Sequence, residues 1–522
     1  MGEETLRRWL PAALMGIIAF ALVLEITEPF GPGLDPDALQ YMGAAESVAA
    51  HASYRVPTAF WFARDSISPM VHFPPGYVTA LAIPVRLGMG PTQGARLVQA
   101  VAAFVTVTVL VMLVSTATTT VVGVALALAL FAMTAMHEVH VSVLSEPLFL
   151  ACTTLVLAAM VSAPTRPWRA GIPAAIGVMT RYAGVALVGA AALWALLERG
   201  SVRQRLQRAI VTVLPAVVLQ GAWVIRSHYA STVEPIRRFA FYGNLGPTLM
   251  QGGETLSAWL VPDPEQWERP LPFRGALALA AGLVVVAVVL AGAWRARTVA
   301  RAAKHDEAHD TSLDEAAPSP ALAWRTMRAA SLLLVCYLGI IAVSRVIADP
   351  KIPLDERILA PALLLAMTLL ALGIASWWRA PGGTVLARIA LAGAMLGWWW
   401  AAGSVTLGEA RYATESGSDF TNESWRKSET LAWAREHGAG LPLYSNWPAA
   451  FYFYLHRPTR ELPRLRDART LAQFADTVRV RGGWVLVFDV QTPEFVPQDS
   501  LRAAPGLRIV ARLRDGIVFA PR

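Results

Sequence analysis

Long apolar runs constrain the fold of this 522-residue chain more than any other feature of its sequence. Nine predominantly apolar runs lie at 10–26, 95–115, 119–136, 145–163, 208–226, 273–294, 328–347, 357–376 and 387–405. Each run is about as long as a helix that crosses a bilayer, which needs about 20 residues. Only 16% of the residues are charged, whereas soluble domains carry about 25%. The sequence therefore predicts a polytopic α-helical membrane protein.

A further apolar run, 170–198, is longer than one membrane span and contains Arg181. Arginines flank it at 166 and 169 on one side and at 199, 203, 205 and 208 on the other. Basic flanks of membrane spans face the cytoplasm. We therefore expect two short helices that enter and return, with Arg181 at the outer turn. The topology then has about eleven spans, a cytoplasmic N-terminus and an extracytoplasmic C-terminus.

Four segments outside the predicted spans are long enough to hold structure or function. Two are outer loops, 27–94 and 227–272, and one is a charged cytoplasmic loop, 295–327, which we expect to be flexible. The fourth, 406–522, reads as a separate extracytoplasmic domain attached to a membrane domain at 1–405.

The tail mixes helix and strand patterns. We expect helices at 424–437 and 468–480 and strands at 441–445 and 484–490. Asp515-Gly516 is a strong hairpin signal near the end of the chain. The pattern predicts a small α/β domain.

Charge and cysteine usage exclude several function classes. The formal charge is +8, but the basic residues sit mostly in short loops between apolar runs and act as topology signals rather than as a nucleic-acid patch. Cys152 and Cys336 both lie inside apolar runs, so no disulfide framework is expected. The sequence has no P-loop, no dinucleotide fingerprint and no serine-hydrolase elbow.

Two acidic residues at the predicted outer ends of spans are candidates for catalysis, because polar groups at membrane depth are costly and usually functional. Asp35-Pro36 is a good helix start, which leaves Asp37 to act as a general base or to hold a substrate hydroxyl. Glu146 opens the run 145–163, where Ser145 and Glu146 also fit a helix cap with an acid favoured by the helix dipole.

Basic and aromatic residues on the same side are candidates for anion and sugar binding. They are His72, Tyr77, Arg181, Arg226, Arg345 and Arg357. Arginine is well suited to phosphate, although snorkelling to the interface explains any one of them alone. Arg357 follows Asp355-Glu356, and we expect an ion pair there to take up part of its charge.

Histidines and acids that could bind a metal occur in two places. His137, Glu138 and His140 have helical spacing but lack the HExxH pattern. His305 and His309 lie in the charged loop, where we expect solvated side chains.

Five short motifs, taken in order, resemble a known superfamily. They are Asp37–Tyr41, Phe73–Tyr77, Ser145–Phe149, Thr180–Tyr182 and Asp355–Pro361. On these the chain resembles the GT-C membrane glycosyltransferases, particularly the protein O-mannosyltransferase-like and aminoarabinose-transferase-like bacterial members. The resemblance covers roughly 1–405, and the tail resembles the periplasmic domains of some members at Tyr444–Pro448.

The resemblance implies an inverting hexosyl- or pentosyltransferase of the cell envelope, located in a bacterial-type cytoplasmic (inner) membrane. The donor would be a polyprenyl-phosphate-linked sugar, and the acceptor a lipid, glycan or protein on the outer face. Asp37 would be the general base, Glu146 would position acceptor or donor, and Arg357 with Arg181 would hold the lipid phosphate.

The chain departs from the family pattern at one position. Ala38 follows Asp37 where many protein-mannosylating members have a second acid, which leaves the acceptor open. Some members use a divalent metal, so His137, Glu138 and His140 keep that question open.

Two alternatives belong to other classes of protein. A flippase or transporter of a lipid-linked glycan would carry charges in the middle of its spans and two related halves, and no such repeat is evident. A non-catalytic envelope assembly protein would use Asp37 and Glu146 only as helix caps.

Overall fold

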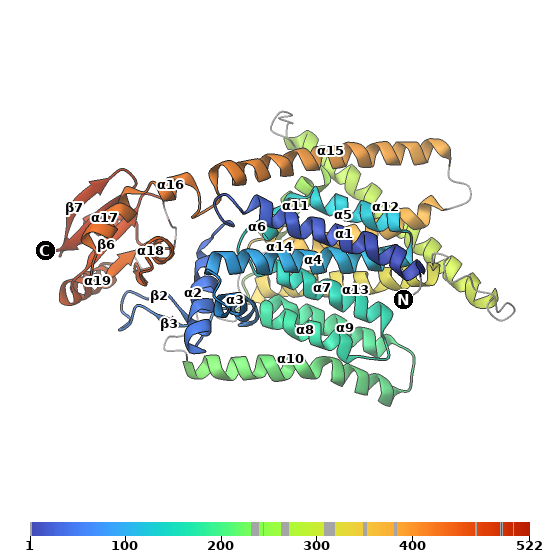
Figure 1. The fold of residues 1–522 in the computed structure, drawn as a ribbon, viewed down its shortest axis with the longest axis horizontal. Coiled ribbons are helices and arrows are strands. Elements are labelled where there is room, and N and C mark those ends of the chain that lie inside the picture. The colour runs from blue at the N-terminus through green and yellow to red at the C-terminus, as the bar shows by residue number, and fades with distance from the viewer. Residues whose placement is uncertain are drawn as a thin grey trace. The chain divides into compact units, whose positions relative to one another are not determined.

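The computed structural model describes the chain at 3–230, 240–243, 245–262, 271–306, 319–347, 352–379, 384–464, 467–490, 492, 494–504 and 506–522. It divides into two compact units, one formed by Met1–Ile26 and Leu97–Tyr412 and the other by Thr27–Arg96 and Ala413–Arg522 (Figure 1). This division differs from the predicted boundary after residue 405, because the first outer loop belongs to the same unit as the tail.

The first unit is helical. Its helices are α1 (Glu3–Ile26), α4 (Pro91–Ala117), α5 (Thr120–Phe131), α6 (Thr134–Val141), α7 (Glu146–Ser162), α8 (Trp168–Thr180), α9 (Val185–Leu197), α10 (Val202–Ala230), α11 (Leu245–Leu260), α12 (Leu271–Asp306), α13 (Pro320–Ile347), α14 (Glu356–Trp378) and α15 (Val385–Ser416). Among the described residues, seven helices are long and apolar enough to cross a membrane, or eight if α5 and α6, bent by 71°, form one broken span. Helix α7 and the segment Tyr182–Leu197 are apolar but shorter. The prediction of a polytopic helical membrane protein is confirmed.

The run 170–198 folds as predicted. Helix α8 ends at Thr180, Arg181 has an extended backbone (φ −145°, ψ 137°), and a 3-10 turn, Tyr182–Gly184, leads into α9. The turn is tight, since a Cβ on Gly184 would lie 2.4 Å from the backbone nitrogen of Val178. The two helices therefore reverse the chain at Arg181.

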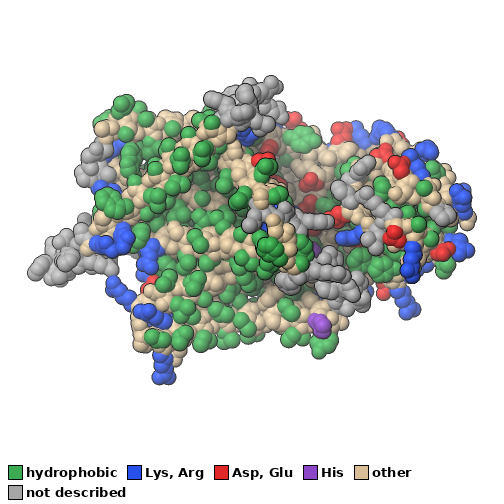
Figure 2. Space-filling model, turned by 180° about the vertical axis from the view of Figure 1, so that it is seen from behind, with side chains coloured by type: hydrophobic (Ala, Val, Ile, Leu, Met, Phe, Trp, Pro, Cys, Tyr) green, Lys and Arg blue, Asp and Glu red, His purple; other side chains and the backbone are tan. Residues whose placement is uncertain are grey.

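The two ends of the helical unit differ in charge. Glu198, just beyond α9, pairs at 2.5 Å with Arg325 in the first turns of α13. The end of α9 and the start of α13 thus lie together, and Arg181, which precedes α9, lies at the opposite end. Figure 2 shows an apolar surface over the helical unit with Lys and Arg side chains gathered toward one end. This distribution is typical of membrane helices with basic flanks.

The second unit is an α/β fold that combines segments from both ends of the chain. From the first outer loop come α2 (Pro36–His51), β1 (Arg55–Val56), β2 (Thr58–Ala59), β3 (Ser68–Pro69) and α3 (Gly76–Arg86). The tail adds α16 (Glu423–Arg426), α17 (Glu429–His437), β4 (Leu443–Ser445), α18 (Pro448–Leu455), β5 (Thr459–Glu461), α19 (Ala468–Arg481), β6 (Trp484–Phe488), α20 (Gln498–Arg502), β7 (Leu507–Leu513) and β8 (Gly516–Pro521). The predicted small α/β tail is confirmed.

One six-stranded sheet forms the centre of this unit. Its strand order is β2-β5-β4-β6-β8-β7, parallel from β2 to β6 and antiparallel from β6 to β7. The hairpin between β7 and β8 turns at Arg514-Asp515, next to Gly516 as the turn signal predicts. Phe474 of α19 and Phe519 of β8 lie in the apolar core on one face of the sheet.

Parts of two predicted loops lie outside the described residues. These parts are 231–239 and 263–270 of the outer loop, and 307–318 of the cytoplasmic loop, which include His309. The described part of the cytoplasmic loop differs from the prediction, since α12 continues to Asp306. The segment 296–304 is rich in Ala, Arg and Lys, which are good helix formers, and this composition explains the extension.

Candidate active site

A buried carboxylate lies at the end of the helical unit that contains the turn between α8 and α9. Glu146 is the first residue of α7, is followed by Pro147, and is only 1% exposed. Ser145 precedes the helix without capping it, because its hydroxyl instead lies between Glu146 and Arg181. The expected serine cap is therefore wrong, and Glu146 needs charged partners to remain ionised in this position.

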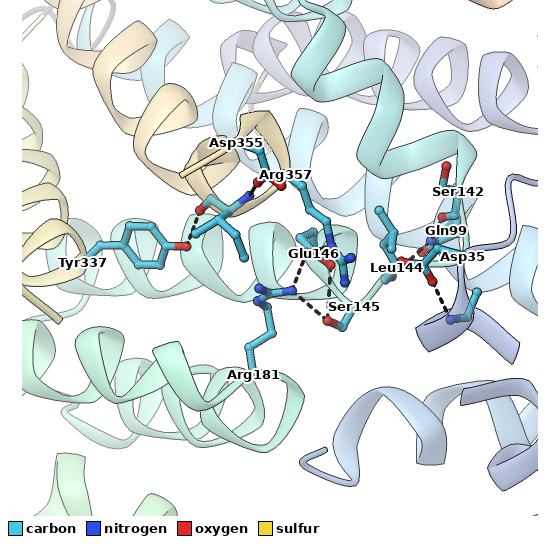
Figure 3. A network of polar contacts seen from close by, with 12 residues as sticks. Asp35, Gln99, Ser142, Leu144, Ser145, Glu146, Arg181, Tyr337, Asp355 and Arg357 are labelled. Carbon is cyan, nitrogen blue, oxygen red and sulfur yellow. Dashed lines mark hydrogen bonds and ion pairs between the residues drawn. The ribbon is translucent and has the colours of Figure 1, made fainter. Parts of the chain in front are cut away.

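Two arginines bind the same oxygen of Glu146. Arg181 Nη1 and Arg357 Nε each lie 2.5 Å from Glu146 Oε1 (Figure 3). Arg181 comes from the turn between α8 and α9, and Arg357 from the first turn of α14. The prediction placed these three residues at the same side of the membrane, and the structure brings their charged groups into contact.

The cluster of Glu146, Arg181 and Arg357 carries two positive charges and one negative charge. The arginine side chains are 15% and 21% exposed, so they remain partly accessible while the carboxylate is enclosed. Each guanidinium carries five N–H donors in a planar fork, a geometry that suits the oxygens of a phosphate group. This arrangement makes the cluster a candidate site for an anion such as a phosphate group.

Side chains around the cluster fix the helix ends that carry it. The Gln99 amide donates to the carbonyls of Ser142 and Leu144, the latter at 3.1 Å, and so holds the turn before α7. At the start of α14, Asp355 accepts from the Ile358 backbone N–H at 2.9 Å, and the Tyr337 hydroxyl donates to the Ile358 carbonyl at 2.6 Å (Figure 3). These contacts limit movement of Glu146 and Arg357.

Asp355 and Glu356, which we expected to share the charge of Arg357, also make contacts of their own. Asp355 is the N-cap of α14, and Glu356 accepts a hydrogen bond from Thr134 at 2.5 Å. Arg357 forms a short ion pair with Glu146 on another helix. Glu146 and Arg357 are 211 residues apart in the sequence, so local sequence patterns could not predict this pairing.

A second polar region lies in the helical unit beside α14. A cavity of about 190 Å³ is lined by polar Thr134, Arg274, Glu356 and Glu409, together with apolar residues from the junction of α5 and α6, from α11 and the residues just after it, and from α15. None of these four residues is among the site residues predicted from the sequence. The signal that could have found them is the presence of ionisable residues inside or next to apolar helices.

The candidate metal ligands do not converge. His140 Nδ1 lies 2.7 Å from the Met136 carbonyl of its own helix. Within the described part of the chain, no three residues among His, Cys, Asp and Glu form a group that could hold a metal ion. His137, Glu138 and His140 therefore do not fit a bound metal in this arrangement.

Asp37 lies in the second unit, in the first turn of α2. Asp35 caps this helix, as predicted, by accepting the Ala38 backbone N–H at 2.6 Å. Asp37 is half-buried. Its role as a general base stays a prediction.

The other predicted binding residues have different environments. His72 is exposed and lies edge-on to Phe73, while Tyr77 is fully buried in edge contact with Tyr41. Arg226 of α10 lies over the ring of Trp223 at 4.8 Å. A binding role for these three residues also stays a prediction.

The comparisons with known proteins identify the fold. No protein-family model and no curated protein sequence matches the chain. Among solved structures, the chain is similar to arabinofuranosyltransferase AftD from Mycobacteria, with a TM-score of 0.55 and 15% identity, over 99% of this chain and 41% of AftD. The chain therefore has the fold of the GT-C membrane glycosyltransferases.

Two further solved structures of this class resemble the chain at lower scores. ArnT from Cupriavidus metallidurans, bound to undecaprenyl phosphate, has a TM-score of 0.45 and 14% identity over 97% of both chains. The oligosaccharyltransferase AglB from Archaeoglobus fulgidus, in complex with an inhibitory peptide and a dolichol-phosphate, has a TM-score of 0.46 and 11% identity over 91% of this chain and 69% of that one.

Proposed function

We propose that this protein is an inverting glycosyltransferase that moves a sugar from a polyprenyl-phosphate donor to an acceptor on the outer face of a bacterial-type cytoplasmic membrane. The observation that carries the proposal is the ion cluster of Glu146, Arg181 and Arg357 in the helical unit, at the end with the turn between α8 and α9. The GT-C fold supports the reaction class.

The arginines would hold the phosphate of the donor. The two guanidinium groups lie together and are partly accessible, with side chains that are 15% and 21% exposed, and Arg binds phosphate oxygens through paired N–H donors. Glu146 would hold these two side chains in place and would thereby position the donor.

The reaction would proceed by direct displacement at the anomeric carbon. Asp37 would take the proton of the acceptor hydroxyl as its oxygen forms a bond to that carbon. The bond from the anomeric carbon to the phosphate oxygen breaks, and its electron pair stays on the polyprenyl phosphate. Arg181 and Arg357 would stabilise the charge that develops there.

A transfer assay tests this proposal. Wild-type protein in nanodiscs is incubated with a panel of radiolabelled polyprenyl-phosphate sugars and a membrane-extract acceptor pool, and labelled product and released polyprenyl phosphate are quantified. We expect transfer from at least one donor. Arg357→Lys should raise the KM for that donor, because lysine keeps the charge but loses the paired donors.

Glu198→Gln is the matched control for this assay, because it removes a carboxylate from an equally short arginine pair at the other end of the helical unit. Its transfer rate should equal that of the wild type. Movement of the intact donor across liposome membranes, without any bond cleavage, would contradict the proposal and favour a flippase.

A further inference from the structure

The first outer loop supplies an edge strand to the sheet of the C-terminal domain. Strand β2 pairs in parallel with β5, with Thr58 opposite Thr459 and Ala59 opposite Arg460. The backbone N–H of Thr459 donates to the Pro57 carbonyl at 3.3 Å. Edge-strand addition joins two segments through main-chain hydrogen bonds. Here it joins parts of one chain about 400 residues apart.

Side chains of the C-terminal domain hold the loop beyond β2. Arg460 is 7% exposed, and its guanidinium donates to the carbonyls of Ala63 and Arg64 at 3.4 and 2.9 Å. Arg481 donates to the carbonyls of Phe62 and Ala63 at 3.1 and 2.5 Å. A nearly buried arginine directed at backbone carbonyls fixes the path of the loop at a cost in desolvation.

Helix α2, which carries Asp37 in its first turn, packs against α18 of the same domain. Gly43 permits this approach, since a Cβ there would lie 2.5 Å from Pro57 and 3.1 Å from the Tyr452 ring. Pro57 directly precedes β2, so α2 packs against the start of the edge strand.

The residues just before α2 are also hydrogen-bonded to the tail. The Phe420 backbone N–H donates to the Leu34 carbonyl at 3.2 Å, and the Tyr454 hydroxyl donates to the Phe420 carbonyl at 2.5 Å. Burial raises the pKa of Tyr454 to about 12, so this hydroxyl keeps its proton at neutral pH. Leu34 is only three residues before Asp37.

We infer that the C-terminal domain positions Asp37 by holding the start of α2 and the loop behind it, with Arg460 and Tyr454 as positioning residues. This inference rests on the proposed role of Asp37 as the general base. It gives the C-terminal domain a part in transfer through the position of Asp37. Misplacing a reacting group by about 1 Å can cost about 10²-fold in rate.

The test combines hydrogen exchange with kinetics on the full chain in nanodiscs. Arg460→Ala should increase amide exchange across 36–51 and lower kcat by about tenfold, as expected for two lost hydrogen bonds. The KM for the donor should stay within about twofold of wild type, because the proposed phosphate site lies in the helical unit. Arg460→Lys should recover part of both losses.

Two further variants make the result specific. Tyr454→Phe removes only the hydroxyl bond to Phe420 and should shift both readouts in the same direction by a smaller factor. Arg479→Ala is the matched control, because Arg479 lies on α19 of the same domain and forms a surface pair with Asp476 in its own helix. It should change neither readout.

The outcomes separate this inference from the proposed function. Unchanged exchange across 36–51 in both Arg460→Ala and Tyr454→Phe would overturn the inference, as would faster exchange with an unchanged kcat. If the wild type transfers no sugar from any donor, the proposed function fails, and faster exchange in both variants would still support the structural coupling of α2 to the domain.

Discussion

Replacing Glu146 by glutamine removes the negative charge that Arg181 and Arg357 share. The two arginine nitrogens each lie 2.5 Å from one carboxylate oxygen, so they are at most about 5 Å apart. At an effective dielectric constant of about 20, two positive charges at that separation repel by about 3 kcal/mol. Breaking a buried ion pair by removing one partner typically costs about 3–5 kcal/mol. We therefore expect Glu146→Gln to lower the free energy of unfolding by about 3 kcal/mol.

Unfolding by SDS in mixed micelles, followed by far-UV circular dichroism, measures this difference. Glu198→Gln is again the control, because its pair with Arg325 has the same 2.5 Å distance but side chains that are 23% and 31% exposed. Exposed pairs contribute at most about 1 kcal/mol. We also expect that adding Arg357→Gln to Glu146→Gln restores part of the lost stability, since the repulsion disappears. Equal effects of Glu146→Gln and Glu198→Gln would refute it.

Three further predictions each concern a single side chain. Tyr337→Phe loses the 2.6 Å hydrogen bond to the Ile358 carbonyl and should destabilise the protein by about 1–3 kcal/mol in the same SDS titration. Gln99→Leu leaves two buried carbonyls without their donor and should cost a similar amount, with a lower transfer rate because the turn before α7 loosens. Burial raises the pKa of Glu46 above its ordinary value of 4.5, so the folded state binds this proton more tightly than the unfolded state and stability falls as pH rises from about 4.5 through the raised pKa. Glu46→Gln should flatten that decline in pH-dependent unfolding, and an unchanged slope would contradict the assignment.

Local patterns explain which parts of the fold could be predicted from the sequence. Apolar length predicted the membrane helices, and the basic flanks of 170–198 together with Arg181 predicted the turn between α8 and α9. The dipeptide Asp515-Gly516 predicted the final hairpin. Each of these features depends on residues that are close together in the chain.

Features built from distant residues could not be predicted in the same way. Strand β2 has two residues and therefore no periodicity, and its partner β5 lies about 400 residues away. The sequence placed Glu146, Arg181 and Arg357 at one side of the membrane by topology, but their contact through one carboxylate oxygen depends on how α7, α8 and α14 pack. Chain order places the loop 27–94 in the membrane domain, whereas its carbonyls at Phe62 and Arg64 accept hydrogen bonds from Arg481 and Arg460 of the tail.

The most direct test of the central claim is the single-turnover rate of sugar transfer by Asp37→Asn, compared with wild type under saturating donor. The variant keeps the size of the side chain and leaves the Asp35 cap of α2 in place. Loss of a general base should reduce the rate by about 10²–10⁴-fold, with retained donor binding and a folded α2 by hydrogen exchange. A rate equal to that of the wild type would contradict the assignment of Asp37 as the base, and with it the mechanism proposed for this protein.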